Sequence, residues 1–165
     1  MIRHLKDSSK YRIAGVKIME LLKPSNLSSE ILADNSFSSL LVLCSDTSRV
    51  RRLLENAGYQ DVKINQALSK SLLDYPKEER PKLVEKTLNN ILKDYERMLV
   101  SSFEMLFDPR YEIDVIKFFC EKARKCKVAL KWPGQLIDSK LIYANPEDPD
   151  YHEYNCNAYQ LRIVK

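Results

Sequence analysis

Zinc-binding and disulfide patterns are missing from this sequence. It has four cysteines, and no two of them form a C-x-x-C pair. Its two histidines, His4 and His152, lie far apart along the chain. Because a structural zinc site needs Cys or His ligands at characteristic spacings, we expect neither a metal site nor a disulfide framework. The thiols are expected to be reduced, as they are in cytoplasmic proteins.

Long apolar segments are missing as well. A helix needs about 20 apolar residues to cross a bilayer, and no stretch of this sequence comes near that length. The chain also begins without a signal-peptide pattern, so we expect a cytoplasmic protein with no membrane contact. The length of 165 residues fits one domain, and the net charge of +4 allows a local surface for nucleic acid or an acidic partner.

Strand and helix patterns alternate along most of the chain. Strands are expected near residues 40–43, 60–65, 97–101, 127–132, 140–144 and 158–164. Helices are expected from residue 48 to the turn at Gly58 and near residues 66–74, 81–95 and 113–125. This alternation predicts an α/β fold with a mainly parallel sheet and flanking helices in a single domain.

The first part of the chain has a different pattern. Residues 8–23 place apolar side chains at helical spacing among lysines and arginines, which predicts an amphipathic helix that ends before Pro24. Residues 25–39 are rich in serine and predict a linker with one helical turn at Ser29–Ala33. We therefore divide the chain into an N-terminal helix and linker, residues 1–38, and an α/β domain, residues 39–165.

Glycine is missing from the loop where an α/β domain would bind phosphate. The loop consists of Cys44, Ser45, Asp46, Thr47 and Ser48. A working P-loop needs glycines, a lysine and a Ser or Thr at fixed spacing. If Cys44 takes the first glycine position, Arg49 falls on the second glycine and Val50 on the lysine. The loop is therefore a degenerate P-loop, or an ordinary turn before a helix capped by Ser45 or Asp46.

The acidic residue that orders magnesium is missing too. P-loop folds carry it at the end of the third strand, but the strand at residues 97–101 ends in Ser101 and Ser102. Glu104 and Asp108 lie beyond that strand end. Because both halves of the magnesium-nucleotide site are absent, we expect no catalytic residue and no cofactor. ATP with magnesium would be the cofactor under one alternative only, a weak or partner-activated ATPase.

Two groups of basic residues are candidates for binding an anion. Arg49, Arg51 and Arg52 fall in the first turns of a helix, where they add to the positive end of the helix dipole. Lys122, Arg124 and Lys125 fall at the end of another helix, where cations favour the helix itself. Both groups fit contacts with the phosphates of double-stranded DNA, and both are also explained as solvated basic faces.

Two other features are expected to be structural. Trp132 stands at a strand end and is expected to pack into the core rather than to stack on a base. Residues 148–154 contain several metal-ligand types, but the spacing of a metal site is absent and a polar loop is expected.

Several blocks of residues follow one another from Leu40 onward in a specific order. They are residues 65–73, 79–80 and 104–109, then Arg124 before a strand that ends in residues 132–134, then residues 141–146, 149–151 and Tyr154. Their order and spacing resemble the BrxF family, the small P-loop-type proteins of BREX bacteriophage-exclusion systems. The resemblance covers about three quarters of the chain.

This resemblance implies more than the residues alone do. It implies a three-layer P-loop NTPase-like sheet of the RecA or AAA type, a role in defence against phage DNA, and other BREX proteins as partners. Members with an intact P-loop have glycines, a lysine and an aspartate where this chain has Cys44, Arg49, Val50 and Ser101. Arg124 falls where ring-forming AAA-type domains place an arginine at a neighbouring subunit, which implies a homo-oligomer with Arg124 at its interface.

Three hypotheses for the function follow from the sequence. The first is a non-catalytic component of a BREX system that binds DNA and assembles with itself and with other BREX proteins. The second is a weak or partner-activated ATPase of the same system. The third is a structural adaptor without DNA affinity. The separate loss of both halves of the magnesium-nucleotide site favours the first.

Overall fold

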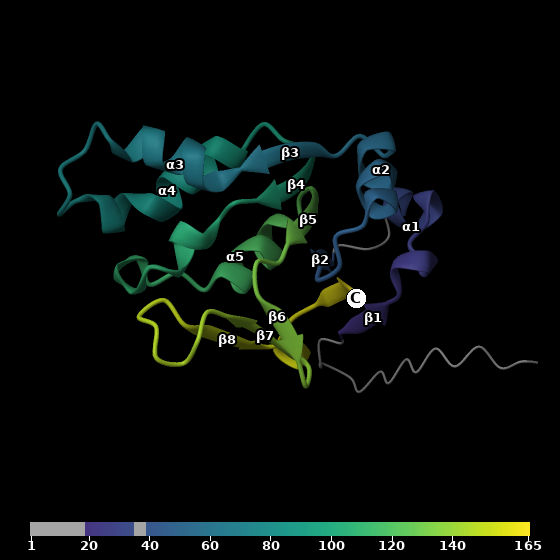
Figure 1. The fold of residues 1–165 in the computed structure, drawn as a ribbon. Coiled ribbons are helices and arrows are strands. Elements are labelled where there is room, and N and C mark those ends of the chain that lie inside the picture. The colour runs from purple at the N-terminus through teal and green to yellow at the C-terminus, as the bar shows by residue number, and fades with distance from the viewer. Residues whose placement is uncertain (1–18, 35–38) are drawn as a thin grey trace, which may run out of the picture.

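The computed structural model describes residues 19–34 and 39–165 (Figure 1). Its α-helices are α1 (Ser29–Ala33), α2 (Ser48–Asn56), α3 (Ile64–Leu72), α4 (Arg80–Leu92) and α5 (Val115–Lys122). Short 3-10 helices are η1 (Pro24–Asn26), η2 (Glu104–Phe107), η3 (Pro109–Tyr111) and η4 (Cys156–Ala158). The strands are β1 (Glu20–Leu22), β2 (Leu40–Leu43), β3 (Gln60–Lys63), β4 (Arg97–Ser101), β5 (Lys127–Lys131), β6 (Gln135–Ile137), β7 (Lys140–Tyr143), β8 (His152–Asn155) and β9 (Leu161–Val164).

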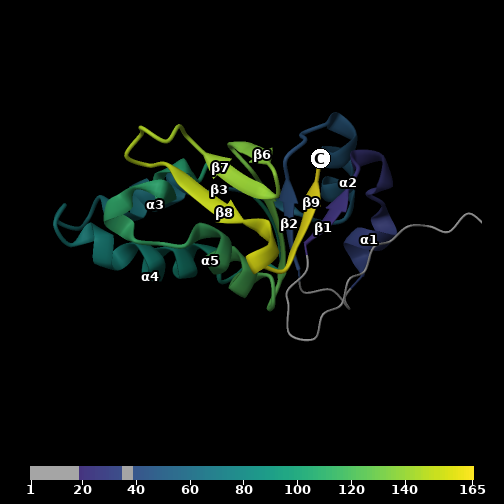
Figure 2. The same ribbon diagram turned by 90° about the horizontal axis from the view of Figure 1, so that it is seen from below.

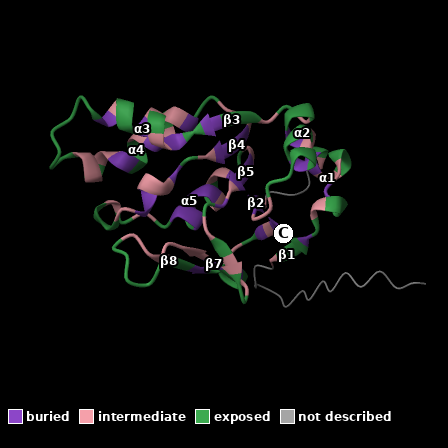
Figure 3. Cartoon of the chain, in the orientation of Figure 1, coloured by how far each residue is buried: buried purple, intermediate pink, exposed green. Residues whose placement is uncertain are grey.

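Six strands form the main sheet, in the order β1-β9-β2-β5-β4-β3. Every neighbouring pair in it is parallel. All residues of β2 are buried, as expected for an apolar strand with neighbours on both sides and layers on both faces. Figure 3 shows the buried residues gathered along this sheet and on the inner sides of the helices. The protein is therefore an α/β protein with a mainly parallel sheet flanked by helices.

The helices cover both faces of the main sheet. Successive side chains of a strand point to opposite faces, so Leu41 and Leu43 pack with Val50 and Leu54 of α2. Leu40 and Val42 belong to the larger cluster on the other face, together with the apolar sides of α3, α4 and α5. Figure 2 shows α1 and α2 on one side of the main sheet and α3, α4 and α5 on the other.

A small antiparallel sheet, β6-β7-β8, lies between β5 and β9 in the chain. The turn that joins β6 to β7 uses Asp138 and Ser139, whose φ angles of 48° and 59° fit the turn type that matches strand twist. The ring of Tyr143 on β7 stacks on Phe107 at 4.1 Å between centroids. This small sheet thus packs on the larger apolar cluster, on the same face as α3, α4 and α5.

The N-terminal prediction is wrong at its end. Residues 20–22, the last part of the predicted helix 8–23, form the strand β1, which pairs in parallel with β9. The main-chain N–H of Lys165 also donates to the carbonyl of Leu22 at 3.0 Å. Pairing across the chain thus overrides the local helical pattern, and residues 8–18 of that prediction lie outside the described residues. The helical turn predicted at Ser29–Ala33 is confirmed as α1.

Most other predicted elements are confirmed, and the strands predicted at residues 40–43 and 97–101 match to the residue. The strand predicted at residues 97–101 is β4, and Trp132 is a buried packing residue, 5% exposed. The polar loop predicted at residues 148–154 is only partly correct, because His152–Asn155 is the strand β8. Tyr154 is the one buried residue of β8, so its sequence carries little of the alternation that marks a strand.

Candidate functional site

The carboxyl ends of β2 and β5 lie next to each other, and the connections that follow these two strands run to opposite faces of the main sheet. After β2 the chain enters α2 on one face, whereas after β5 it runs to the small sheet on the other face. In open α/β sheets, ligands bind at such a point, outside the carboxyl ends of the strands. The loop Cys44–Ser48 lies there, at the end of β2.

The main chain of this loop is directed to the neighbouring strand. The N–H groups of Cys44 and Ser45 both donate to the carbonyl of Val164 at the end of β9, at 2.8 and 3.2 Å. The α2 cap is Thr47, whose hydroxyl accepts from the N–H of Val50 at 3.2 Å. The cap residue is therefore neither Ser45 nor Asp46. A phosphate cradle needs free N–H groups that point inward, and two of them are already bound here.

Asp46 places a negative charge in the same loop. Its carboxylate lies 2.7 Å from the ammonium of Lys131, at the end of β5, and 3.6 Å from the guanidinium of Arg51. The hydrogen bond from Lys131 lowers the pKa of the Asp46 carboxyl, and the charges of Lys131 and Arg51 lower it further. Both cations thus face an internal anion at the place where a nucleotide phosphate would need them.

Cys44 offers no nucleophile at this edge. Burial and the nearby thiol of Cys156 raise the pKa of the Cys44 thiol to about 12, against a smaller lowering by Lys165. The thiol is therefore protonated at neutral pH, whereas reactive cysteines are thiolates.

The two carboxylates beyond β4 are also engaged. The Glu104 carboxylate accepts from the side-chain amide of Asn65 at 2.9 Å, and the carbonyl of that amide accepts from the N–H of Met105 at 3.1 Å. Asp108 forms an ion pair with Arg110 at 2.6 Å, and that guanidinium lowers the pKa of the Asp108 carboxyl. Both carboxylates therefore serve local structure, at the start of α3 and around η3.

The three arginines predicted to bind an anion, Arg49, Arg51 and Arg52, make different contacts in the structure. Arg49 donates from its two terminal nitrogens to the carbonyls of Pro24, at 2.6 Å, and Leu27, at 2.9 Å. It therefore ties the first turn of α2 to the segment before α1. Arg51 is paired with Asp46, and Arg52 is exposed and donates to the carbonyl of Ser48 at 3.4 Å. Sequence reasoning missed the Arg49 contacts because their partners lie 22 and 25 residues earlier.

The predicted lysine group lies at the other edge of the sheet. Lys122 ends α5, and Arg124 and Lys125 occupy the turn before β5, at the amino end of that strand. Because the strands are parallel, this edge is opposite the loop Cys44–Ser48. The structure therefore does not bring the two predicted basic groups together. Arg124 and Lys125 are exposed, and Lys122 lies over the ring of Phe118 at 5.8 Å.

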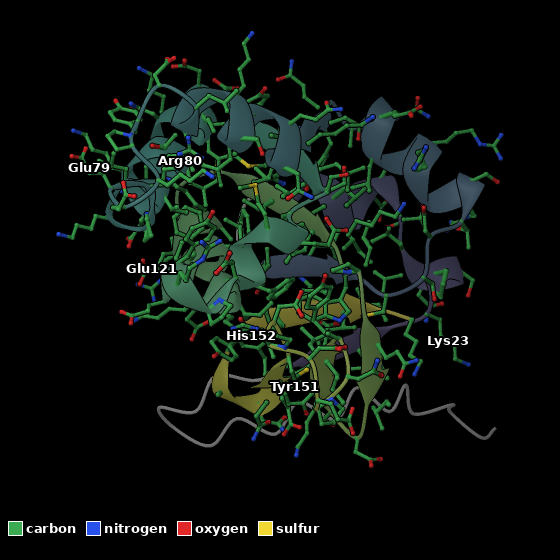
Figure 4. All side chains as sticks on the ribbon, turned by 60° about the vertical axis from the view of Figure 1, so that its left-hand side comes forward. Lys23, Glu79, Arg80, Glu121, Tyr151 and His152 are labelled. Carbon is green, nitrogen blue, oxygen red and sulfur yellow. The ribbon has the colours of Figure 1, made fainter. Side chains whose placement is uncertain are left out.

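The start of β8 carries another possible metal ligand, His152. Figure 4 labels His152, the first residue of β8, and Tyr151, which directly precedes this strand. His152 is held by its ring nitrogen against the carbonyl of Asp150 at 2.9 Å, and its ring stacks on Tyr154. Among the described residues, no group of three or more His, Cys, Asp or Glu side chains could hold a metal ion.

Comparisons with known proteins identify no relative of this chain. No protein-family model, no curated protein and no solved structure matches it. In the part of the chain that the structure describes, none of the helices combines the length and the apolar character needed to cross a membrane.

The contacts of Arg49 predict a structural effect of its removal. In Arg49→Ala, the carbonyls of Pro24 and Leu27 lose their charged donor, so we expect a loss of about 1–2 kcal/mol in the free energy of unfolding. Urea denaturation measures it. Arg52→Ala is the matched control, and we expect its effect to stay within about 0.5 kcal/mol. Equal effects of the two variants would mean that Arg49 does not hold α2 to this segment.

Proposed function

We propose that this protein is a non-catalytic component of a BREX anti-phage defence system, built on a P-loop-like scaffold of the RecA or AAA type. In this role it binds double-stranded DNA and assembles with itself and with other BREX proteins. The BREX role rests on the resemblance to the BrxF family, which runs from Leu40 onward over about three quarters of the chain.

The order of the strands supports the P-loop-like part of the proposal. Apart from β1 and the small sheet, the main sheet has the order β9-β2-β5-β4-β3. The strand β2, which precedes the loop Cys44–Ser48, thus lies inside the main sheet. Its two neighbours, β5 and β9, are the strands of this sheet that come last in the chain. Helices on both faces complete the three layers expected from the resemblance.

The state of the loop Cys44–Ser48 is the observation that carries the non-catalytic part. Two of its N–H groups are bound to Val164, its carboxylate is paired with Lys131, and glycine is absent from it. A nucleotide phosphate would meet the negative charge of Asp46 in a loop whose nearby cations already have a partner. Such a loop is poorly suited to holding the phosphates of ATP for hydrolysis.

Magnesium-ATP binding tests this part directly. We expect a calorimetric titration of the pure protein to give no heat of binding at about 1 mM nucleotide. The same titration is repeated with companion BREX proteins present. Saturable binding in either experiment would contradict the proposal and favour a weak or partner-activated ATPase.

Duplex binding tests the DNA part. Fluorescence anisotropy with a labelled duplex is expected to give an affinity that falls by about 30-fold or more between about 50 and 200 mM salt, because phosphate contacts release counterions. Co-purification with companion BREX proteins is the readout for assembly. Stable co-purification without duplex binding at about 50 mM salt would leave a structural adaptor instead.

A further inference from the structure

Basic side chains surround a hollow of about 500 Å³ at the amino end of β4 and β5. We name it the amino-edge hollow, and its charged lining residues are Lys93, Glu96, Arg97, Lys122, Lys125 and Lys127. These are five cations and one carboxylate, a net charge of +4. The lining of the hollow is therefore strongly positive.

Two of the lining cations, Arg97 and Lys127, are already hydrogen-bonded within the protein, and we call them the floor of the hollow. Arg97 donates to the carbonyl of Ala57, which caps α2, and Lys127 donates to the carbonyls of Leu32 and Asp34 at the end of α1. The last carbonyls of a helix lack internal partners, so these two side chains stabilise the ends of α1 and α2. Burial lowers the pKa of the Lys127 ammonium, and the positive charges of Arg97 and Arg162 lower it further.

The other three lining cations, Lys93, Lys122 and Lys125, form no ion pair among the described residues, and we call them the rim. Lys93 follows α4, Lys122 ends α5, and Lys125 lies in the turn before β5. Within residues 19–34 and 39–165, none of the three forms an ion pair. They differ in this from Arg49 and Arg51, whose guanidinium groups have partners. The rim therefore keeps its charge available for an external anion.

We infer that the amino-edge hollow binds the sugar-phosphate backbone of duplex DNA through Lys93, Lys122 and Lys125. This inference rests on the proposed function, since it names the surface that contacts DNA. It places that surface at the edge opposite the degenerate loop. Lys122 and Lys125 are near each other in the sequence, whereas Lys93 follows α4, about 30 residues earlier, and joins them only in the fold.

The composition of the hollow favours a nucleic acid over a protein partner. Protein interfaces are centred on buried apolar or aromatic anchors and are depleted in lysine. The large exposed apolar side chains of the described residues, Leu21, Leu73, Tyr75 and Ile137, all lie outside the hollow. Lysines that no carboxylate neutralises are typical of phosphate contacts that position a protein on DNA without reading its sequence.

The test compares two variants of equal charge. In the first, Lys93, Lys122 and Lys125 are all replaced by Gln. In the second, the exposed lysines Lys70, Lys77 and Lys82, on α3, α4 and the turn between them, are replaced by Gln. Lys82 and Lys93 lie at opposite ends of α4, roughly 17 Å apart along its axis. Thermal unfolding shows that both variants are folded, and anisotropy with a labelled duplex measures binding over a range of salt concentrations.

The expected result is specific to the rim. We expect the first variant to bind the duplex about tenfold or more weakly than the wild type, with a salt slope smaller by about 2–3, and the second to change both much less. Equal losses in the two variants, or no loss in the first, would overturn the inference and leave the proposed DNA binding intact. A wild type that does not bind the duplex would overturn both. Poly-glutamate is the second probe in the same assay. If the first variant binds the duplex like the wild type but loses binding to poly-glutamate, the occupant is an acidic protein and the inference is wrong.

Discussion

Phe107→Ala is expected to lower the free energy of unfolding by about 3–5 kcal/mol, the cost of removing a fully buried aromatic ring. The ring of Phe107 lies 5.8 Å from Trp132 and 4.1 Å from Tyr143, between centroids. It therefore joins the main sheet, through Trp132, to the small sheet, through Tyr143. Its removal leaves a cavity at the place where the two sheets are packed together.

Urea denaturation measures this effect, with Trp132 fluorescence as the signal, because Trp132 is the one tryptophan of the chain. Tyr75→Ala is the control, since Tyr75 is 43% exposed and its loss is expected to cost about 0.5 kcal/mol or less. A loss below about 1 kcal/mol for Phe107→Ala would contradict the packing described here.

Gly134→Ala is expected to destabilise the protein by about 2–5 kcal/mol. A Cβ atom at this position would lie 1.8 Å from the carbonyl oxygen of Ile142 and 3.1 Å from the indole nitrogen of Trp132. The indole N–H donates to that same carbonyl at 3.2 Å. The added methyl group therefore pushes β7 away from the segment before β6, and the buried indole loses its acceptor.

A second glycine provides the comparison. Gly58 has a φ of +85°, and a Cβ there would meet no atom closer than 3.9 Å. Gly58→Ala thus adds backbone strain without a collision, and we expect a loss of about 1–2 kcal/mol. Urea denaturation of both variants separates the two effects. If Gly134→Ala costs no more than Gly58→Ala, the close approach of residue 134 to β7 is not a constraint on the fold.

The sequence predicts much of the fold where local pattern and tertiary packing agree. β2 and β4 are apolar runs flanked by turn residues, and their burial on both faces follows from that composition. β1 fails this rule, because Glu20 and Leu21 are exposed and only pairing with β9 makes the segment a strand. β8 fails it for a similar reason, since its pairing with β7 sets its conformation.

Some features of the candidate site can likewise be predicted from the sequence, and others cannot. The absence of glycine and lysine from the loop Cys44–Ser48 is read directly from the sequence, because it concerns residue types at fixed spacing. The partner of Asp46 cannot be read in this way, since Lys131 lies on a strand that becomes its neighbour only when the sheet forms. The contact of Arg49 with the segment before α1 and the joining of Lys93 to the amino-edge hollow are likewise products of the fold.

The position of β9 has a consequence for the order in which the protein folds. β9 is formed by residues 161–164, yet it lies inside the main sheet, between β1 and β2. While the ribosome is making the chain, β1 has no partner in the sheet and β2 has one bare edge until this segment emerges. Contacts between residues so distant in sequence form slowly. During that interval the open edge of β2 can pair with another nascent chain, so companions that bind early would protect the most apolar strand of the sheet.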